Sequence, residues 1–176
     1  MGWLLLVVFI AFLVIVFIGM RRVLLVFSGS RLLRICGATL FVANVFVALT
    51  AGLGGITLAA GIDKFPVAWL AGTPFRSYLI PGLILAVVVG GSATGAALAT
   101  LRSRGTGALS SMLAGAIMLG WLAGERLILP PAAFPPQLWW LEAIYVAAGL
   151  LMAAPAVVIR WADRRRRSQH APAATA

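Results

Sequence analysis

Three ionisable residues lie inside otherwise apolar stretches of this chain, and they are the side chains best placed to do chemistry: Glu125, Arg126 and Glu142. Charged groups within membrane spans are costly and usually serve an ion or substrate pathway. Glu125 and Arg126 lie near the end of one apolar stretch, and Glu142 lies near the start of the next. On antiparallel helices both depths are about 6 Å below the interface. We therefore predict an ion pair between Arg126 and Glu142 that joins the two helices.

Glu125 should face a different direction, because consecutive residues of a helix point about 100° apart. We expect it to face Asp63 and Lys64, or Arg76, which belong to an earlier loop on the same side. We favour a structural cluster that pins the ends of three helices together. The alternative is a proton or cation site that uses Glu125. A proton relay would normally need deeper carboxylates in series, and residues 35–61 and 79–101 contain none.

Catalysis finds little support in the residue types. The single histidine, His170, lies in the tail, and the single cysteine, Cys36, begins an apolar helix. A serine–histidine–aspartate set needs a structured histidine, zinc needs three or four ligands, and bis-histidine haem needs two histidines. We therefore predict no catalytic residue, no metal and no cofactor. An intramembrane enzyme acting on lipids is the least favoured alternative, because no nucleophile–base pair is visible.

Five apolar stretches must position these residues in a chain that is 62% hydrophobic. A helix needs about 20 apolar residues to cross a bilayer. The expected spans are residues 3–20, 35–61, 79–101, 108–129 and 138–160. We predict an all-α polytopic membrane helix bundle that forms one domain over residues 1–162. Short interfacial helices are expected at 23–27 and within 63–78, and residues 163–176 are expected to form a basic, disordered tail.

The basic residues divide by side of the membrane. Eleven of the thirteen arginines occupy alternate gaps between the spans, namely Arg21, Arg22, Arg31, Arg34, Arg102, Arg104, Arg160 and Arg164 to Arg167. Short cytoplasmic loops retain such residues, which predicts an outer N-terminus and a cytoplasmic C-terminus. The net charge of +10 then lies entirely on the inner side. It favours anionic inner-leaflet lipids contacting Arg164, Arg165, Arg166 and Arg167, and argues against nucleic acid as the partner.

Arginine outnumbers lysine thirteen to one, and alanine is abundant. Both features are typical of a high-GC bacterial genome. We therefore expect the chain to lie in a bacterial cytoplasmic membrane.

Small residues recur every four positions on two neighbouring spans. The first stripe is Gly91, Gly95 and Ala99, and the second is Ala116, Gly120 and Gly124. A six-residue loop joins these spans, so they must run antiparallel and side by side. Small residues let membrane helices approach closely. We predict that the two stripes form the contact between these helices.

Two further segments each leave a pair of interpretations open. Residues 51–57 are rich in glycine, which favours close packing of an intact helix over a helix break that lines a ligand cavity. The loop 63–78 is rich in aromatic residues and proline. It is expected to anchor at the membrane interface, and the functional alternative is a lid over a substrate site.

The entry into the third span carries a more specific motif. Residues 72–85 read GTPFRSYLIPGLIL, preceded by Gly54-Gly55-Ile56 and followed by VVVGG at 87–91 and by Gly120-Trp121-Leu122. Over residues 52–155 the chain resembles a group of uncharacterised bacterial multi-spanning membrane proteins that share an S/T-P-F-x-x-Y/F-L-I-P-G-L entry into a span. The resemblance implies a polytopic membrane fold and carries over no biochemical role.

These observations favour a non-catalytic integral membrane protein that is a small subunit or accessory component of a membrane complex. Its partner would be another membrane protein or a second copy of the chain. The alternative is a small oligomeric transporter or channel that uses Glu125 and Glu142. Five spans are few for a monomeric carrier, so this alternative requires oligomerisation.

Overall fold

The protein is an all-α bundle, and its computed structural model describes residues 2–62, 65–129 and 139–169. The elements are α1 Gly2–Val26, α2 Arg31–Ala59, η1 Val67–Leu70, α3 Leu79–Leu83, η2 Ile84–Gly90, α4 Gly91–Thr100, α5 Arg104–Ile128 and α6 Trp139–Gln169. α3, η2 and α4 form one continuous span, Leu79–Thr100. Five helices are long and apolar enough to cross a membrane, and the described residues contain no strand. The predicted fold class is confirmed.

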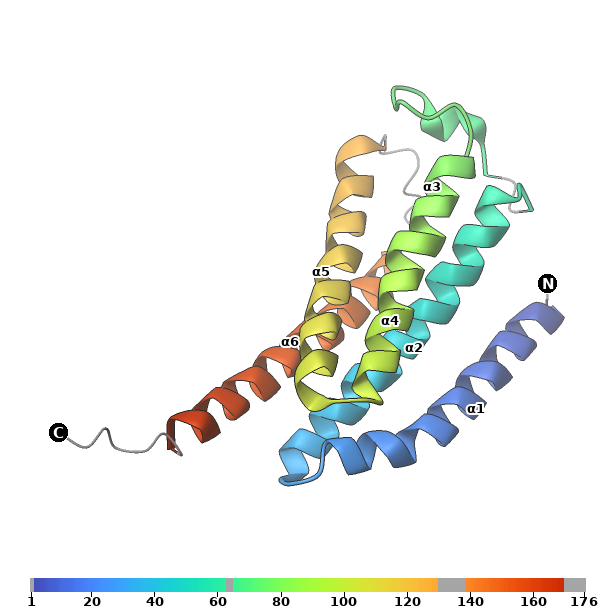
Figure 1. Cartoon of the computed structure of the whole chain (residues 1–176). Helices are drawn as coiled ribbons and strands as arrows, with labels where there is room; N and C mark the ends of the chain where they lie inside the picture. The colour runs from blue at the N-terminus through green and yellow to red at the C-terminus, as the bar shows by residue number, and fades with distance from the viewer. Residues whose placement is uncertain (1, 63–64, 130–138, 170–176) are drawn as a thin grey trace.

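α2 is the central helix and packs against α1, α6 and the third span (Figure 1). It begins after a turn in which Gly29 has a φ of 131°, a conformation that favours glycine. The side chain of Ser30 then accepts a hydrogen bond from the backbone N–H of Leu33, which caps the helix. The helix starts four residues before the predicted position and continues without a break through the glycine-rich segment. Of the two interpretations of that segment, the structure contains the intact helix.

The glycine-rich half of α2 packs against the outer half of the third span by backbone contact. A Cβ added at Gly55 would lie 2.4 Å from the backbone nitrogen of Ala86, and one at Gly82 would lie 2.6 Å from that of Ala59. A Cβ at Gly90 would lie 2.8 Å from the backbone of Gly52. Only glycine permits an approach this close. The third span has a π-helical segment, η2, at this contact, and the sequence contains no signal that predicts it.

The predicted contact between the two small-residue stripes is wrong. Gly91, Gly95 and Gly120 are exposed, and a Cβ at any of them would meet nothing within 4 Å. Ala116 is exposed as well, and Gly124 likewise has no neighbour within 4 Å.

The helices α4 and α5 do pack together, as the short loop requires, but through other residues. A Cβ added at Gly107 of α5 would lie 2.8 Å from the Cα of Thr100 on α4, so these two residues are in close contact. Almost every face of α4 carries small side chains, so the spacing of small residues did not identify which face is buried.

Several helix ends differ from the predicted boundaries. α1 continues past Arg21 to Val26, so the expected separate interfacial helix at 23–27 is instead the bent end of this helix (Figure 1). α5 begins at Arg104, four residues before the expected position, because Ser103 accepts a hydrogen bond from the Thr106 N–H and caps it. α6 continues to Gln169, so the expected disordered tail is helical over 163–169.

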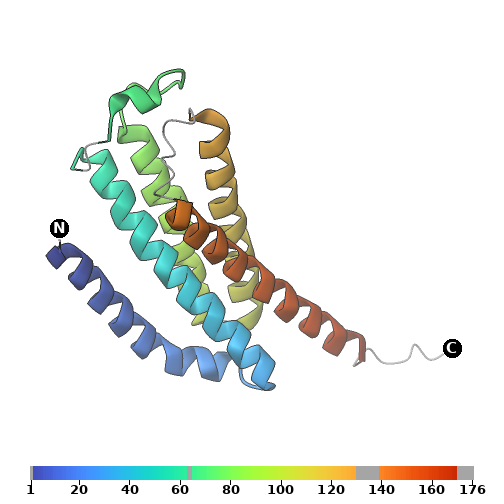
Figure 2. The same cartoon turned by 180° about the vertical axis from the view of Figure 1, so that it is seen from behind.

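α1 contacts the rest of the bundle along one side, from Phe12 to Phe27, and its N-terminal end stands apart. Both views show its N-terminal half diverging from α2 (Figures 1 and 2). The inner end is well packed, because Val23 and Phe27 are fully buried and the Phe27 ring occupies the space beside Gly37. Farther out, the apolar side chains are exposed on most sides, and α1 is the least buried of the five candidate spans.

Candidate functional site

The predicted ion pair between α5 and α6 is present, and it joins the last turn of α5 to the first turn of α6. Arg126 Nε donates to Glu142 Oε1 at 2.5 Å, and Arg126 Nη2 donates to Glu142 Oε2. Arg126 lies in the last turn of α5 and Glu142 in the first turn of α6. Each charge therefore also complements the dipole of its own helix, which is negative at the C-terminus and positive at the N-terminus. The bidentate geometry fixes the two helix ends relative to each other.

Glu125 faces away from this pair, as predicted, and is half-buried. Its carboxylate accepts a hydrogen bond from the side chain of Trp121, one turn earlier on α5. The expected ionic neighbours are not seen at Glu125: Arg76 is exposed and has no ion pair with a described carboxylate, and Asp63 and Lys64 lie outside the described residues. The site therefore joins two helices by an ion pair, and Glu125 is a separate group beside it.

The geometry of this cluster favours a structural role over ion coordination. Glu142 already has both oxygens engaged by one guanidinium. Across the described residues, no three His, Cys, Asp or Glu side chains come together in a way that could hold a metal ion. In this cluster, Glu125 is the carboxylate that forms no ion pair with a described residue, and it accepts a hydrogen bond from the Trp121 side chain.

A buried polar contact that was not predicted lies at the centre of the bundle. Asn44 on α2 and Ser111 on α5 are fully buried. The Asn44 amide nitrogen donates to the Leu40 carbonyl at 2.7 Å and to Ser111 Oγ at 2.9 Å. Asn44 Oδ1 has no hydrogen-bond partner among the described residues. An asparagine within an apolar span was the signal available, because such side chains hydrogen-bond across membrane helices.

Arginine side chains join the turns at the end of the bundle where α1 meets α2 and the third span meets α5. Arg22 Nε donates to the Leu101 carbonyl at 3.0 Å, and Arg104 donates to the Ser28 carbonyl. Arg104 also lies 3.7 Å from a carboxylate oxygen of Asp163 on α6. These contacts satisfy backbone carbonyls at helix ends, which otherwise lack partners. Such a structural role for inner arginines was not predicted.

The four arginines predicted to contact lipid all fall on the last turns of α6, which extend away from the other helices (Figure 1). Arg164 and Arg165 are exposed, and the guanidinium of Arg165 lies 3.6 Å from the centre of the Trp161 ring. The side chains of Arg166 and Arg167 are not among those that the structure describes. Lipid contact itself remains a prediction.

The outer loop forms a small aromatic cluster beside η1. The ring of Phe65 lies 5.7 Å from that of Trp69 and 6.0 Å from that of Tyr78. The Tyr78 hydroxyl donates to the Pro66 carbonyl at 2.9 Å, and desolvation raises the pKa of this phenol. The hydroxyl therefore stays protonated at neutral pH and holds the loop closed. The cluster fits interfacial anchoring, because aromatic rings of this kind favour headgroup depth.

No protein-family model, curated protein or solved structure matches this chain. Function must therefore be argued from the contacts and surfaces described above.

Proposed function

We propose that the protein is a non-catalytic accessory subunit of a complex in a bacterial cytoplasmic membrane. Its N-terminus would lie outside and its C-terminus in the cytoplasm, with the arginine-rich helix ends against anionic lipids. Its membership of the group that shares the TPFxxYLIPGL-type span entry is part of the same proposal. Residues 79–83 of that motif form a helix start in which Gly82 packs tightly against α2.

The observation that carries the accessory role is the uncovered small-residue surface on α4. Gly91 and Gly95 form a small-x-x-x-small pair that faces outward and contacts nothing in the chain. Lipid contact does not require small residues, whereas helix–helix contact in membranes does favour them. The poorly covered outer half of α1 is a second apolar surface available to a partner helix.

The test is a pull-down from native membranes in a mild detergent through a C-terminal tag, followed by mass spectrometry. We expect a larger membrane protein in a stoichiometric amount. Gly95→Leu should abolish its recovery, while Ala154→Leu, at an exposed position on α6, should not. A lone monomer with no co-purifying protein would refute the accessory role, as would equal recovery with both variants.

The second candidate function is an oligomeric transporter that uses Glu125 and Glu142, which is favoured by the position of Glu125 within a span without an ion pair to a described cation. A clean homo-oligomer in the pull-down would favour it. Glu125→Gln would then be tested by ion flux in proteoliposomes, and unchanged flux would remove its main support. The proposed orientation is tested independently by fusing a cytoplasm-dependent fluorescent reporter to the C-terminus, which should be bright.

A further inference from the structure

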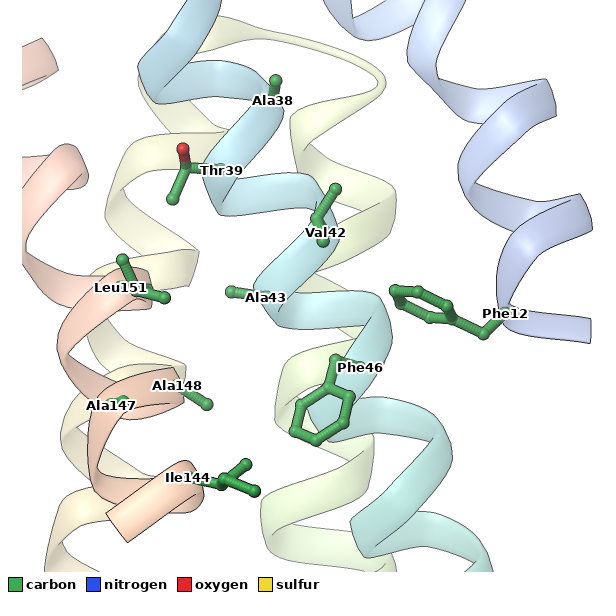
Figure 3. A pocket seen from close by; sticks show the side chains of 10 residues that line it. All are labelled: Phe12, Ala38, Thr39, Val42, Ala43, Phe46, Ile144, Ala147, Ala148 and Leu151. Atoms are coloured by element: carbon green, nitrogen blue, oxygen red, sulfur yellow. The ribbon is translucent and has the colours of Figure 1, made fainter. Parts of the chain in front are cut away.

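An apolar trough runs along the side of the bundle between α2 and α6 (Figure 3). It encloses about 540 Å³ and opens sideways, toward the hydrocarbon of a bilayer. α2 contributes the floor and α6 one wall, while Phe12 of α1 stands on the opposite side. The trough exists because both helices present small side chains to it, among them Ala38, Ala43, Ala147 and Ala148.

Large side chains close one end of the trough. Phe46 and Ile144 lie at the end nearer the outer loops, and the Phe46 ring is 6.5 Å from that of Phe12 and 6.1 Å from that of Tyr145. The other end, beside Ala38 and Thr39, leads toward the arginine-rich ends of the helices.

A cation continues the line of the trough on α2. Steps of four residues lead from Thr39 through Ile35 to Arg31 along one face of the helix. Ile35 and Arg31 are both exposed. Among the described residues the carboxylate of Asp163 pairs with Arg104 and that of Glu142 with Arg126, and neither forms an ion pair with Arg31. The apolar surface thus ends at an uncompensated positive charge.

The length of this surface matches one leaflet of a bilayer. Arg31 and Phe46 are fifteen residues apart on α2, which is about 22 Å along a helix. Half of a bilayer, including the headgroups, is about 20–22 Å thick. A phospholipid with its phosphate at Arg31 would therefore place the end of an acyl chain against Phe46.

We propose that the trough is a binding site for one anionic phospholipid, whose phosphate is bound by Arg31 and whose acyl chain lies between α2 and α6. The charge at the inner end selects an anionic headgroup, and the alanine-lined wall admits the chain. The site does not depend on the partner proposed above.

The test is native mass spectrometry of the full-length protein in a non-ionic detergent, titrated with dioleoyl phosphatidylglycerol or dioleoyl phosphatidylcholine. We expect one retained phosphatidylglycerol, bound about tenfold more tightly than phosphatidylcholine, because phosphatidylglycerol keeps a net negative charge whereas the choline cation of phosphatidylcholine offsets its phosphate and repels Arg31. Arg31→Gln should remove this preference. Arg102→Gln is the matched control, because it deletes an exposed inner arginine on another turn.

The chain-binding part is tested separately by filling the trough. Ala147→Phe should weaken binding of both lipids, whereas Ala123→Phe, at an exposed position on α5, should not. If Ala147→Phe fails to fold, Ala147→Ile replaces it. Equal affinity for the two lipids, equal effects of the two arginine variants, or equal effects of the two alanine variants would overturn the proposal.

Discussion

Replacing Gly55 by alanine tests the backbone contact between α2 and the third span. The added methyl group would lie 2.4 Å from the Ala86 nitrogen and 2.5 Å from the Gly82 carbonyl oxygen, whereas ordinary contacts begin at 3.4 Å. The two helices must therefore separate by about 1 Å, because backbone atoms cannot rotate away as a side chain can. Overpacking of this kind costs about 1–3 kcal/mol, which is a 5- to 150-fold change in the unfolding equilibrium.

The matched control is Gly54→Ala, one residue earlier on the same helix. A Cβ at Gly54 meets nothing within 4 Å, and alanine is favoured over glycine in a helix by about 1 kcal/mol. We expect Gly55→Ala to lower, and Gly54→Ala to keep or raise, the midpoint of unfolding by sodium dodecyl sulfate in mixed micelles, followed by circular dichroism. Equal midpoints for the two variants would refute the contact.

Three other predictions concern side-chain contacts. Ser111→Ala should cost about 0.6 kcal/mol, the average for hydrogen bonds between membrane helices. The double variant Ser111→Ala with Asn44→Leu should cost less, because it replaces both partners and removes the unpaired carbonyl oxygen. Detergent unfolding that ranks the two in the reverse order would contradict this. Arg126→Glu or Glu142→Arg alone places like charges together and should lower the same midpoint, and the double variant should recover it if the pair is in contact. Tyr78→Phe should speed protease cleavage of the outer loop in proteoliposomes several-fold, since it removes the hydrogen bond that closes the loop. The unfolding midpoint should not change. Unchanged cleavage would mean that the Tyr78 hydroxyl does not hold the loop.

The number and order of the spans could be predicted because hydropathy over about 20 residues reports bilayer crossing directly. Helix ends were less predictable. α1 continues past its arginines, since long basic side chains can reach the interface while their backbone stays helical. α2 and α5 begin at serine caps, a local signal that hydropathy does not contain.

The choice of packing face illustrates what spacing cannot determine. The stripe through Gly91 and Gly95 and the buried face through Ala93 and Ala97 are both small, and only the position of the neighbouring helix distinguishes them. By contrast, Gly82, Ala86 and Gly90 also recur every four residues and do form a contact with α2. The spacing of small residues therefore identifies candidate packing faces, and the fold determines which of these faces contacts another helix.

The ion pair between Arg126 and Glu142 could be predicted because helix rise fixes the depth of each residue and a short connection fixes which helices are neighbours. The bond between Asn44 and Ser111 could not, because it joins helices separated in sequence by the third span. Whether Asn44 and Ser111 meet depends on where α2 and α5 cross.

The loose attachment of α1 makes its tilt responsive to the thickness of the surrounding bilayer. Its apolar segment, residues 3–20, is about 27 Å long, slightly less than a typical hydrocarbon core of about 30 Å. A thinner bilayer is accommodated by tilting, and a thicker one holds the helix upright. Because Phe27 holds the inner end of α1 in the bundle while Phe12 lies on the diverging half, a change in tilt moves Phe12 relative to α2. Hydrophobic mismatch would thus set how closely Phe12 approaches the α2 side of the trough.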